Sequence, residues 1–146
     1  MMTLPSPPQI QITYSDSLEI NENFESFVKN VLKEKDIHTG IIDIRFVNET
    51  EICRLHKEYL GQESVTDIVT FNLGDQESPM ADLYICYEQA KRQAKQYKQS
   101  LEKELKRLII HGILHCCGYD DIKEEDRERM ENEQEKLLEK LGDISD

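Results

Sequence analysis

The chain has 146 residues, of which 33% are charged and 38% hydrophobic, and its formal net charge at pH 7 is −12. This length allows a hydrophobic core, so we expect a single domain over residues 1–146. No apolar run approaches the roughly 20 residues that a membrane span requires, and residues 1–8 lack the basic and apolar parts of a secretory signal. Composition therefore argues against a membrane protein and favours a cytoplasmic one.

The first third of the chain predicts a flexible start, a strand and a helix. Three prolines fall within residues 1–8 and favour an extended, flexible segment. Residues 9–14 then alternate apolar and polar side chains, which indicates a half-buried strand. Asn21 or Asn23 can cap a helix that runs to about Lys35, because an asparagine side chain accepts hydrogen bonds from the first free N–H groups of a helix.

The middle of the chain predicts three further strands and one helix. Residues 41–47 form an apolar strand pattern, and Asn48 then caps a helix over residues 49–60. Residues 67–71 are rich in β-branched side chains and predict the next strand. A polar loop separates it from a strand over residues 81–86.

The last part of the chain is helical. One helix is predicted from residue 87 to about 98, and Ser100 caps a second helix that continues through His115 and ends at Gly118. A final helix covers about residues 122–141. Because the strands come early and the helices late, we expect an α+β fold with one mixed four-stranded sheet and about five helices.

Two histidines four residues apart mark the candidate site, in the helical stretch over residues 108–121. On a helix, His111 and His115 lie on one face and can bind a single metal ion. Gly118 can then reverse the chain, because glycine readily adopts the left-handed conformation that ends helices. This reversal would bring Asp121 back as a third ligand. Imidazole and carboxylate together suit one Zn²⁺ ion.

Simpler interpretations of the same residues remain open. His111 and His115 can merely stabilise the negative end of a helix. Asp121 and Glu124 have the spacing of a capping box, so Asp121 can cap the last helix instead of binding metal, or do both. Asp120 is a candidate catalytic residue that acts by orienting an imidazole ligand from behind.

Gly112 argues against a peptidase. A metalloprotease helix reads His-Glu-x-x-His, and its glutamate is the general base. Here Gly112 occupies the position of that glutamate. The histidine pair is therefore expected to serve a different substrate.

The four cysteines are Cys53, Cys86, Cys116 and Cys117. None forms a Cys-x-x-Cys motif, and we expect reduced thiols that behave as small buried residues. Cys116 or Cys117 as an additional metal ligand is the alternative.

Charge is distributed unevenly along the chain. Residues 88–110 contain seven basic and three acidic side chains, whereas residues 120–146 contain five basic and twelve acidic ones. The basic residues of the first segment are Lys91, Arg92, Lys95, Lys98, Lys103, Lys106 and Arg107. This segment can hold a phosphate backbone, or it can simply be a solvated helix face.

The histidine stretch resembles the signature of the YbeY family, also called the rRNA maturation factor family, which reads His-Gly-x-Leu-His-x-x-Gly-Tyr-Asp-His. The matching residues are His111, Gly112, Leu114, His115, Gly118, Tyr119 and Asp120. Residues 66–71 and 81–85 resemble two further family segments. Two positions depart from the family: Asp121 replaces its third histidine, and Leu60 follows Tyr59 where the family often has an arginine that is thought to act in catalysis.

The resemblance implies a single-strand-specific, metal-dependent endoribonuclease that acts in ribosomal RNA processing, at the 3′ end of 16S rRNA, and in ribosome quality control. It also implies a zincin-like arrangement in which the sheet packs on the histidine helix and residues 66–71 border the cleft. The expected partners are single-stranded precursor RNA and the small ribosomal subunit. The alternative is a zinc-containing ribosome assembly factor that does not cut RNA, in which a fourth protein ligand such as Cys117 closes the site.

Overall fold

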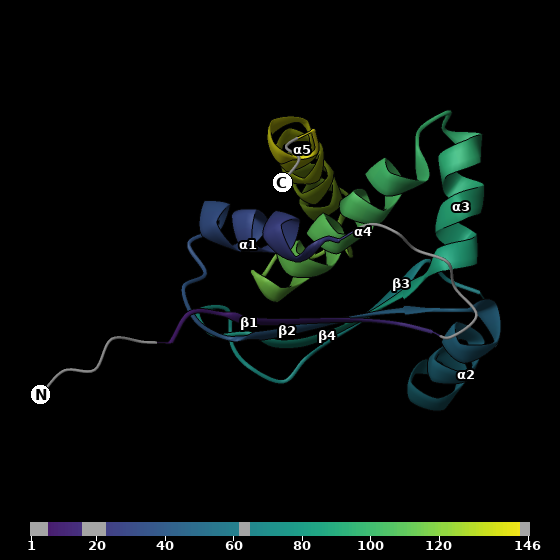
Figure 1. Cartoon of the computed structure of the whole chain (residues 1–146), viewed down its shortest axis with the longest axis horizontal. Helices are drawn as coiled ribbons and strands as arrows, with labels where there is room; N and C mark the ends of the chain where they lie inside the picture. The colour runs from purple at the N-terminus through teal and green to yellow at the C-terminus, as the bar shows by residue number, and fades with distance from the viewer. Residues whose placement is uncertain (1–5, 16–22, 62–64, 144–146) are drawn as a thin grey trace, which may run out of the picture.

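A computed structural model of the chain describes residues 6–15, 23–61 and 65–143 (Figure 1). The described residues form β1 (Gln9–Tyr14), α1 (Glu25–Glu34), β2 (Ile41–Val47), α2 (Glu49–Leu60), β3 (Ile68–Asn72), β4 (Met80–Cys86), α3 (Tyr87–Gln96), α4 (Leu101–Cys116) and α5 (Glu124–Leu141). The predicted α+β fold with about five helices is confirmed. The expected flexible start lies mostly outside the described residues.

The four strands form one mixed sheet in the order β1–β2–β4–β3. β1, β2 and β4 run parallel, whereas β3 runs antiparallel to β4 and forms one edge of the sheet. α1, α4 and α5 cover one face of the sheet (Figure 1). On the opposite face, Ile52 of α2 packs with Val69 of β3 in a smaller apolar cluster. The mixed sheet agrees with the prediction.

Helix α4 is central to the fold, because ten of its sixteen residues are buried. Leu105, Ile109 and Ile113 belong to the main core between the helices and the sheet. The helix begins where the sequence predicts, since Ser100 Oγ accepts a hydrogen bond from Lys103 N at 3.1 Å. Burial along most of this helix fixes the position of the histidines at its far end.

Gly112 lets α4 lie directly against the sheet. A Cβ atom at this position would come within 2.1 Å of Leu83 Cδ2 in β4 and 3.1 Å of Ile68 Cδ1 in β3. The face on which a metalloprotease would carry its glutamate is therefore packed against strand side chains. This close packing explains why position 112 is a glycine.

The beginnings of two helices differ from the predictions. α1 begins after Phe24, and Asn23 contributes by accepting a hydrogen bond from Glu25 N at 3.0 Å; Asn21 lies outside the described residues. The predicted capping box at Asp121 is wrong. Lys123 has extended backbone and is the N-cap of α5 without a side-chain cap, so the helix begins beyond the reach of the Asp121 carboxylate.

Helix α5 closes the core above α4. Its buried residues include Met130, Leu137, Leu138 and Leu141, as its sequence pattern predicts. Most of its other side chains are charged and exposed. No helix among the described residues is both long and apolar enough to cross a membrane.

Candidate metal centre

The end of α4 reverses the chain as the sequence predicts. Gly118 has a φ of 96°, which favours glycine, and its N–H donates to the carbonyl of His115 at 3.1 Å. The N–H of Tyr119 donates to the carbonyl of Leu114 at 3.1 Å, which completes a Schellman motif. The returning chain places Asp121 Oδ2 3.8 Å from His115 Nε2.

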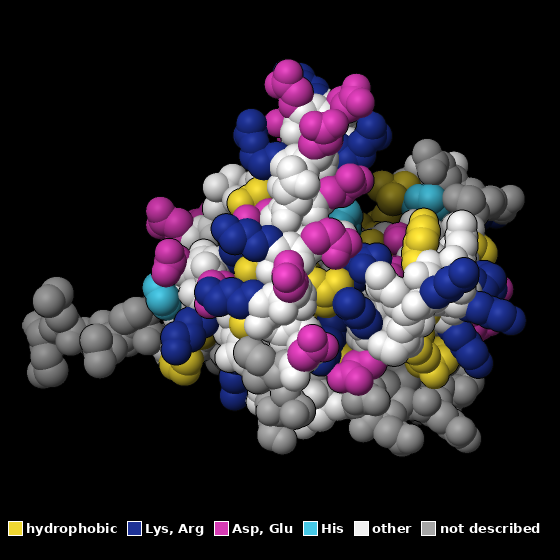
Figure 2. Space-filling view, turned by 90° about the horizontal axis from the view of Figure 1, so that it is seen from above, with side chains coloured by type: hydrophobic (Ala, Val, Ile, Leu, Met, Phe, Trp, Pro, Cys, Tyr) yellow, Lys and Arg dark blue, Asp and Glu magenta, His cyan; other side chains and the backbone are white. Residues whose placement is uncertain are grey.

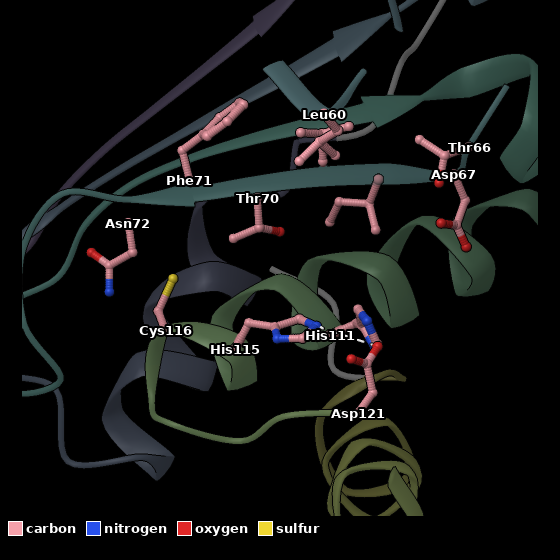
Figure 3. A pocket seen from close by; sticks show the side chains of 12 residues that line it. Leu60, Thr66, Asp67, Thr70, Phe71, Asn72, His111, His115, Cys116 and Asp121 are labelled. Atoms are coloured by element: carbon pink, nitrogen blue, oxygen red, sulfur yellow. Dashed lines mark ion pairs between the residues drawn. The ribbon is translucent and has the colours of Figure 1, made fainter. Parts of the chain in front are cut away.

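The reversal brings the three predicted ligands together. His111, His115 and Asp121 each offer one ligand atom, and these atoms lie within 4.8 Å of one another. The two imidazole rings are 4.8 Å apart between centroids and nearly perpendicular, at 79°. Figure 3 shows these side chains at one wall of a pocket. Two imidazoles and one carboxylate form a donor set that fits Zn²⁺ with an open position.

Gln134 of α5 fixes the orientation of His111. Its Oε1 lies 2.8 Å from His111 Nδ1, and the Gln134 residue is only 8% exposed. The amide oxygen accepts the Nδ1 proton, so Nε2 carries the lone pair that a metal needs. Sequence reasoning missed this contact. The signal was a glutamine within the otherwise apolar buried stripe of the last helix.

The environment of His115 favours its neutral form. Burial lowers the pKa of the imidazole, and the neighbouring His111 lowers it further, although Asp121 acts in the opposite direction. A neutral imidazole is the form that binds metal, because protonation occupies the lone pair. The site therefore presents His115 ready for coordination at neutral pH.

The ligands face a pocket of about 440 Å³ between β3 and α4 (Figure 3). Its lining residues are Leu60, Thr66, Asp67, Ile68, Val69, Thr70, Phe71, Asn72, His111, His115, Cys116 and Asp121. The lining contains no lysine or arginine in the described part of the chain. Leu60, at the position of the family arginine, is 55% exposed and forms part of the wall.

Asp120 has a different contact from the one expected of it. Its Oδ1 accepts a hydrogen bond from Ile122 N at 3.2 Å, and it lines a separate hollow with Cys117 and Arg129. Within the described residues, no hydrogen bond joins Asp120 to either imidazole. Asp120 thus stabilises the turn that carries Asp121, while Gln134 makes the imidazole contact that was predicted for Asp120.

The cysteines do not complete a closed site. All four are free, and burial raises the pKa of the Cys116 thiol to about 12. Burial also raises the pKa of Cys117, which lines the separate hollow beside Asp120. Neither thiol belongs to the described ligand group. The described part of the chain offers three candidate ligands at this site, and the site opens on the pocket.

The basic segment is only partly available to a ligand. Arg92 pairs with Glu49, Lys106 with Glu102, and Arg107 with Glu104 and Glu135. Lys91, Lys95, Lys98 and Lys103 are exposed and form no ion pair with another described residue. Figure 2 shows basic side chains over α3 and many acidic ones along α5. The predicted basic surface is therefore reduced to these lysines.

Fold and site together define a class: a small α+β protein with a histidine–histidine–carboxylate set of the kind that metal-dependent hydrolases use. The chain belongs to the endoribonuclease YbeY family, whose model matches residues 9–142. It is 34% identical to the endoribonuclease YbeY of Finegoldia magna over 133 residues, covering 88% of this chain and 87% of that protein. It is 35% identical to the one from Ruthia magnifica, covering 91% and 94%. The solution structure of TM1509 from Thermotoga maritima aligns with a TM-score of 0.61 and 29% identity, covering 91% of this chain and 89% of that one.

Proposed function

We propose that this protein is a zinc-dependent endoribonuclease that cuts single-stranded RNA in the cytoplasm. Its substrate would be precursor ribosomal RNA, including the 3′ end of 16S rRNA, and it would contribute to ribosome quality control on the small subunit. Family membership supports the endonuclease activity. One observation carries the metal dependence: His111, His115 and Asp121 converge at the wall of an open pocket.

Some residues of the site would bind the metal ion, and others would orient those ligands. His111, His115 and Asp121 would hold one Zn²⁺, which when bound can lower the pKa of a water molecule and polarise a phosphoryl oxygen. Gln134 holds the Nδ1 proton of His111 and so presents Nε2 to the ion. Asp120 holds the turn before α5 and so positions Asp121. The open side of the ligand set leaves space for the phosphate.

The exposed lysines in and just after α3 would attract the RNA. Lys91 and Lys95 stand on the surface of α3 and Lys98 lies in the turn that follows it, and each adds positive charge in an otherwise acidic protein. Contacts between lysine and phosphate release counterions and strengthen binding at low salt. The acidic surface of α5 would repel phosphates and so restrict the strand to the other side of the site (Figure 2).

The non-cutting assembly factor is the weaker alternative. A structural zinc site normally has four protein ligands. The described residues supply three candidate ligands, which line an open pocket, whereas Cys117 lines a separate hollow. This openness supports an enzyme.

Metal removal tests the proposal. The zinc-loaded protein should cut a labelled single-stranded RNA and leave the matching duplex intact. A chelator should abolish cleavage, and stoichiometric Zn²⁺ should restore it. Undiminished cleavage by metal-free protein would contradict the proposal. A precursor 16S rRNA with extra 3′ nucleotides, presented on small subunits, tests the ribosomal part in the same assay.

A further inference from the structure

The outer edge of β3 borders the metal pocket and pairs with no other described strand. β3 is the last strand in the sheet order, and its ladder runs to β4 alone. The seven residues from Thr66 to Asn72 all line the pocket that also contains His111 and His115. A strand edge of this kind exposes a row of main-chain donors and acceptors. These groups therefore face the space in which a substrate would lie.

The hydrogen-bond pattern shows which main-chain groups point outward. Cys86 N donates to Asp67 O at 2.8 Å, so Asp67 belongs to the set of β3 residues that bond to β4. In an antiparallel pair, bonded and non-bonded residues alternate along the strand. Thr70 lies three positions after Asp67 and therefore belongs to the other set. Its N–H and C=O point to the outer edge, away from β4.

The side chain of Thr70 points toward α4. Successive side chains of a strand alternate between its two faces. Ile68 packs against the main core on the α4 face of the sheet, whereas Val69 belongs to the cluster on the opposite face. Thr70 thus shares the face of Ile68, and Figure 3 shows it on the α4 side of β3, with Thr70 and His115 both at the pocket. Thr70 therefore combines a hydroxyl and an outward N–H at the pocket that His111 and His115 also line.

The charge of the pocket makes these neutral donors important. Its described lining contains two carboxylates, Asp67 and Asp121, and no lysine or arginine. Leu60 occupies the position where the family often has arginine. A phosphate that enters the pocket would therefore depend on the metal and on N–H and O–H donors. Main-chain N–H groups bind anions well, and hydrogen bonds to charged groups are stronger than neutral ones.

Resting on the proposed function, we propose that Thr70 binds a phosphate of single-stranded RNA through its outward main-chain N–H and its hydroxyl, beside His111 and His115. The free edge of β3 is then the part of the site that anchors the RNA backbone. Because these donors contact phosphate and not a base edge, the anchor would be indifferent to sequence.

The hydroxyl is tested with Thr70→Val, which keeps a β-branched side chain. The zinc-loaded variant should bind a short labelled single-stranded RNA about tenfold more weakly, because one hydrogen bond to a charged group is lost. Binding is measured by fluorescence anisotropy at low temperature, with a gel to verify that the RNA is intact. Thr13→Val, on the exposed side of the opposite edge strand β1, is the matched control and should bind as the unchanged protein does.

The main-chain N–H is tested with proline. Thr70→Pro removes an N–H that points outward, so the ladder to β4 should survive, as it does when proline occurs in edge strands. This variant should fold, bind zinc normally and lose RNA affinity by a further factor of about ten. Val69→Pro removes an N–H directed at β4 and should fail to fold, which checks the assignment of the two sets.

The salt dependence of RNA affinity shows whether Thr70 contributes an uncharged hydrogen bond or whether the substitution disturbs the charged contacts of the surface. The logarithm of RNA affinity falls with the logarithm of salt concentration with a slope set by the number of cation–phosphate contacts. Thr70→Val should weaken binding equally at all salt concentrations and leave the slope unchanged. Leu60→Arg adds a cation to the same pocket and should steepen the slope by about one unit.

The result that overturns the inference is a folded, zinc-loaded Thr70→Val and Thr70→Pro pair that binds RNA as the unchanged protein does. It would also be overturned if an extended peptide, but not RNA, lost affinity in these variants, since the edge would then be a peptide-docking strand. If the unchanged protein binds RNA through Thr70 but does not cut it with zinc, the proposed function fails while this inference stands.

Discussion

Polar side chains near the two ends of α4 differ in the partners that they have within the protein. Near its start, Glu104 is only 2% exposed, and its Oε2 accepts a hydrogen bond from Gln93 Nε2 at 2.8 Å. Arg107 Nη1 lies 3.5 Å from Glu104 Oε1, and Arg107 Nη2 donates to Gln99 Oε1 at 2.8 Å. Glu104 Oε1 and Arg107 Nε make no hydrogen bond with another described residue, but both atoms lie in ion pairs, the second with Glu135 at 3.2 Å. The charges at this end are therefore paired within the protein, so this end of the helix supplies structure.

At the other end of α4, the polar groups have few protein partners. Gln134 contacts one nitrogen of His111, and Asp121 lies at ion-pair distance from His115. The remaining ligand atoms face the pocket. Two imidazoles and a carboxylate that converge on one pocket form a donor set of the kind that binds metal ions, whereas Glu104 and Arg107 form ion pairs with protein groups. The comparison teaches that the donor set, rather than burial, distinguishes the candidate site from the structural cluster.

Removing the histidines should have the largest effect. His111→Ala and His115→Ala each delete one of three ligands, so zinc should be lost on gel filtration and RNA cleavage should fall to background. The melting temperature of the metal-free protein should change little, because both histidines are only partly buried. His38→Ala removes an exposed histidine away from the site and is the control. Stoichiometric zinc in either variant would contradict the assignment.

Asp121→Asn should have the next largest effect. This variant keeps the size of the side chain but removes its charge, so zinc affinity should fall by a factor of about ten to a hundred. Affinity is measured by competition with a chromophoric chelator. Asp120→Asn, one residue earlier, is the matched control and should retain most of the affinity. Equal zinc affinity in both variants would make Asp121 an ordinary surface residue.

Local signals predicted most of the fold. The strand alternation over residues 9–14, the Asn48 and Ser100 caps and the turn at Gly118 each depend on neighbouring residues, and each is found in the structure. The predicted helix start at Asn48 is confirmed, and the structure adds a capping box in which the Asn48 side chain accepts a hydrogen bond from Glu51 N at 2.9 Å. Periodicity and capping are encoded locally, which is why a single sequence suffices for them.

Long-range packing decided the features that the sequence did not predict. The contact between Gln134 and His111 joins residues 23 positions apart and depends on how α5 crosses α4. The pairing of Arg107 with Glu135 likewise arises from that crossing and removes a cation from the predicted basic surface. The Asp121 cap failed because the chain bends at residues 122–123 and α5 begins only after Lys123. No local pattern contains this information.

Gln134→Leu should lower zinc affinity less than the loss of a ligand does, because Gln134 acts on the metal only through His111. Leucine keeps the volume but cannot accept the Nδ1 proton of His111, so zinc affinity should fall about tenfold. Gln134→Glu restores an acceptor and should recover most of the affinity, which a purely structural role would not predict. Unfolding by urea in the metal-free state provides the stability control. The interpretation fails if both variants bind zinc alike.

The smallest effect on the metal is expected at the structural end of α4. Burial raises the pKa of Glu104, although the hydrogen bond from Gln93 and the charge of Arg107 oppose the shift. The folded protein therefore holds this proton more tightly than the unfolded chain. As a result, the free energy of unfolding should fall as pH rises from the usual glutamate value through the raised one. Glu104→Gln cannot ionise, so the difference between the two proteins in urea unfolding should grow in favour of the variant from about pH 4 to pH 7.

Zinc affinity should stay unchanged, because Glu104 is not a ligand. A fall in zinc affinity would show that the two ends of α4 are coupled.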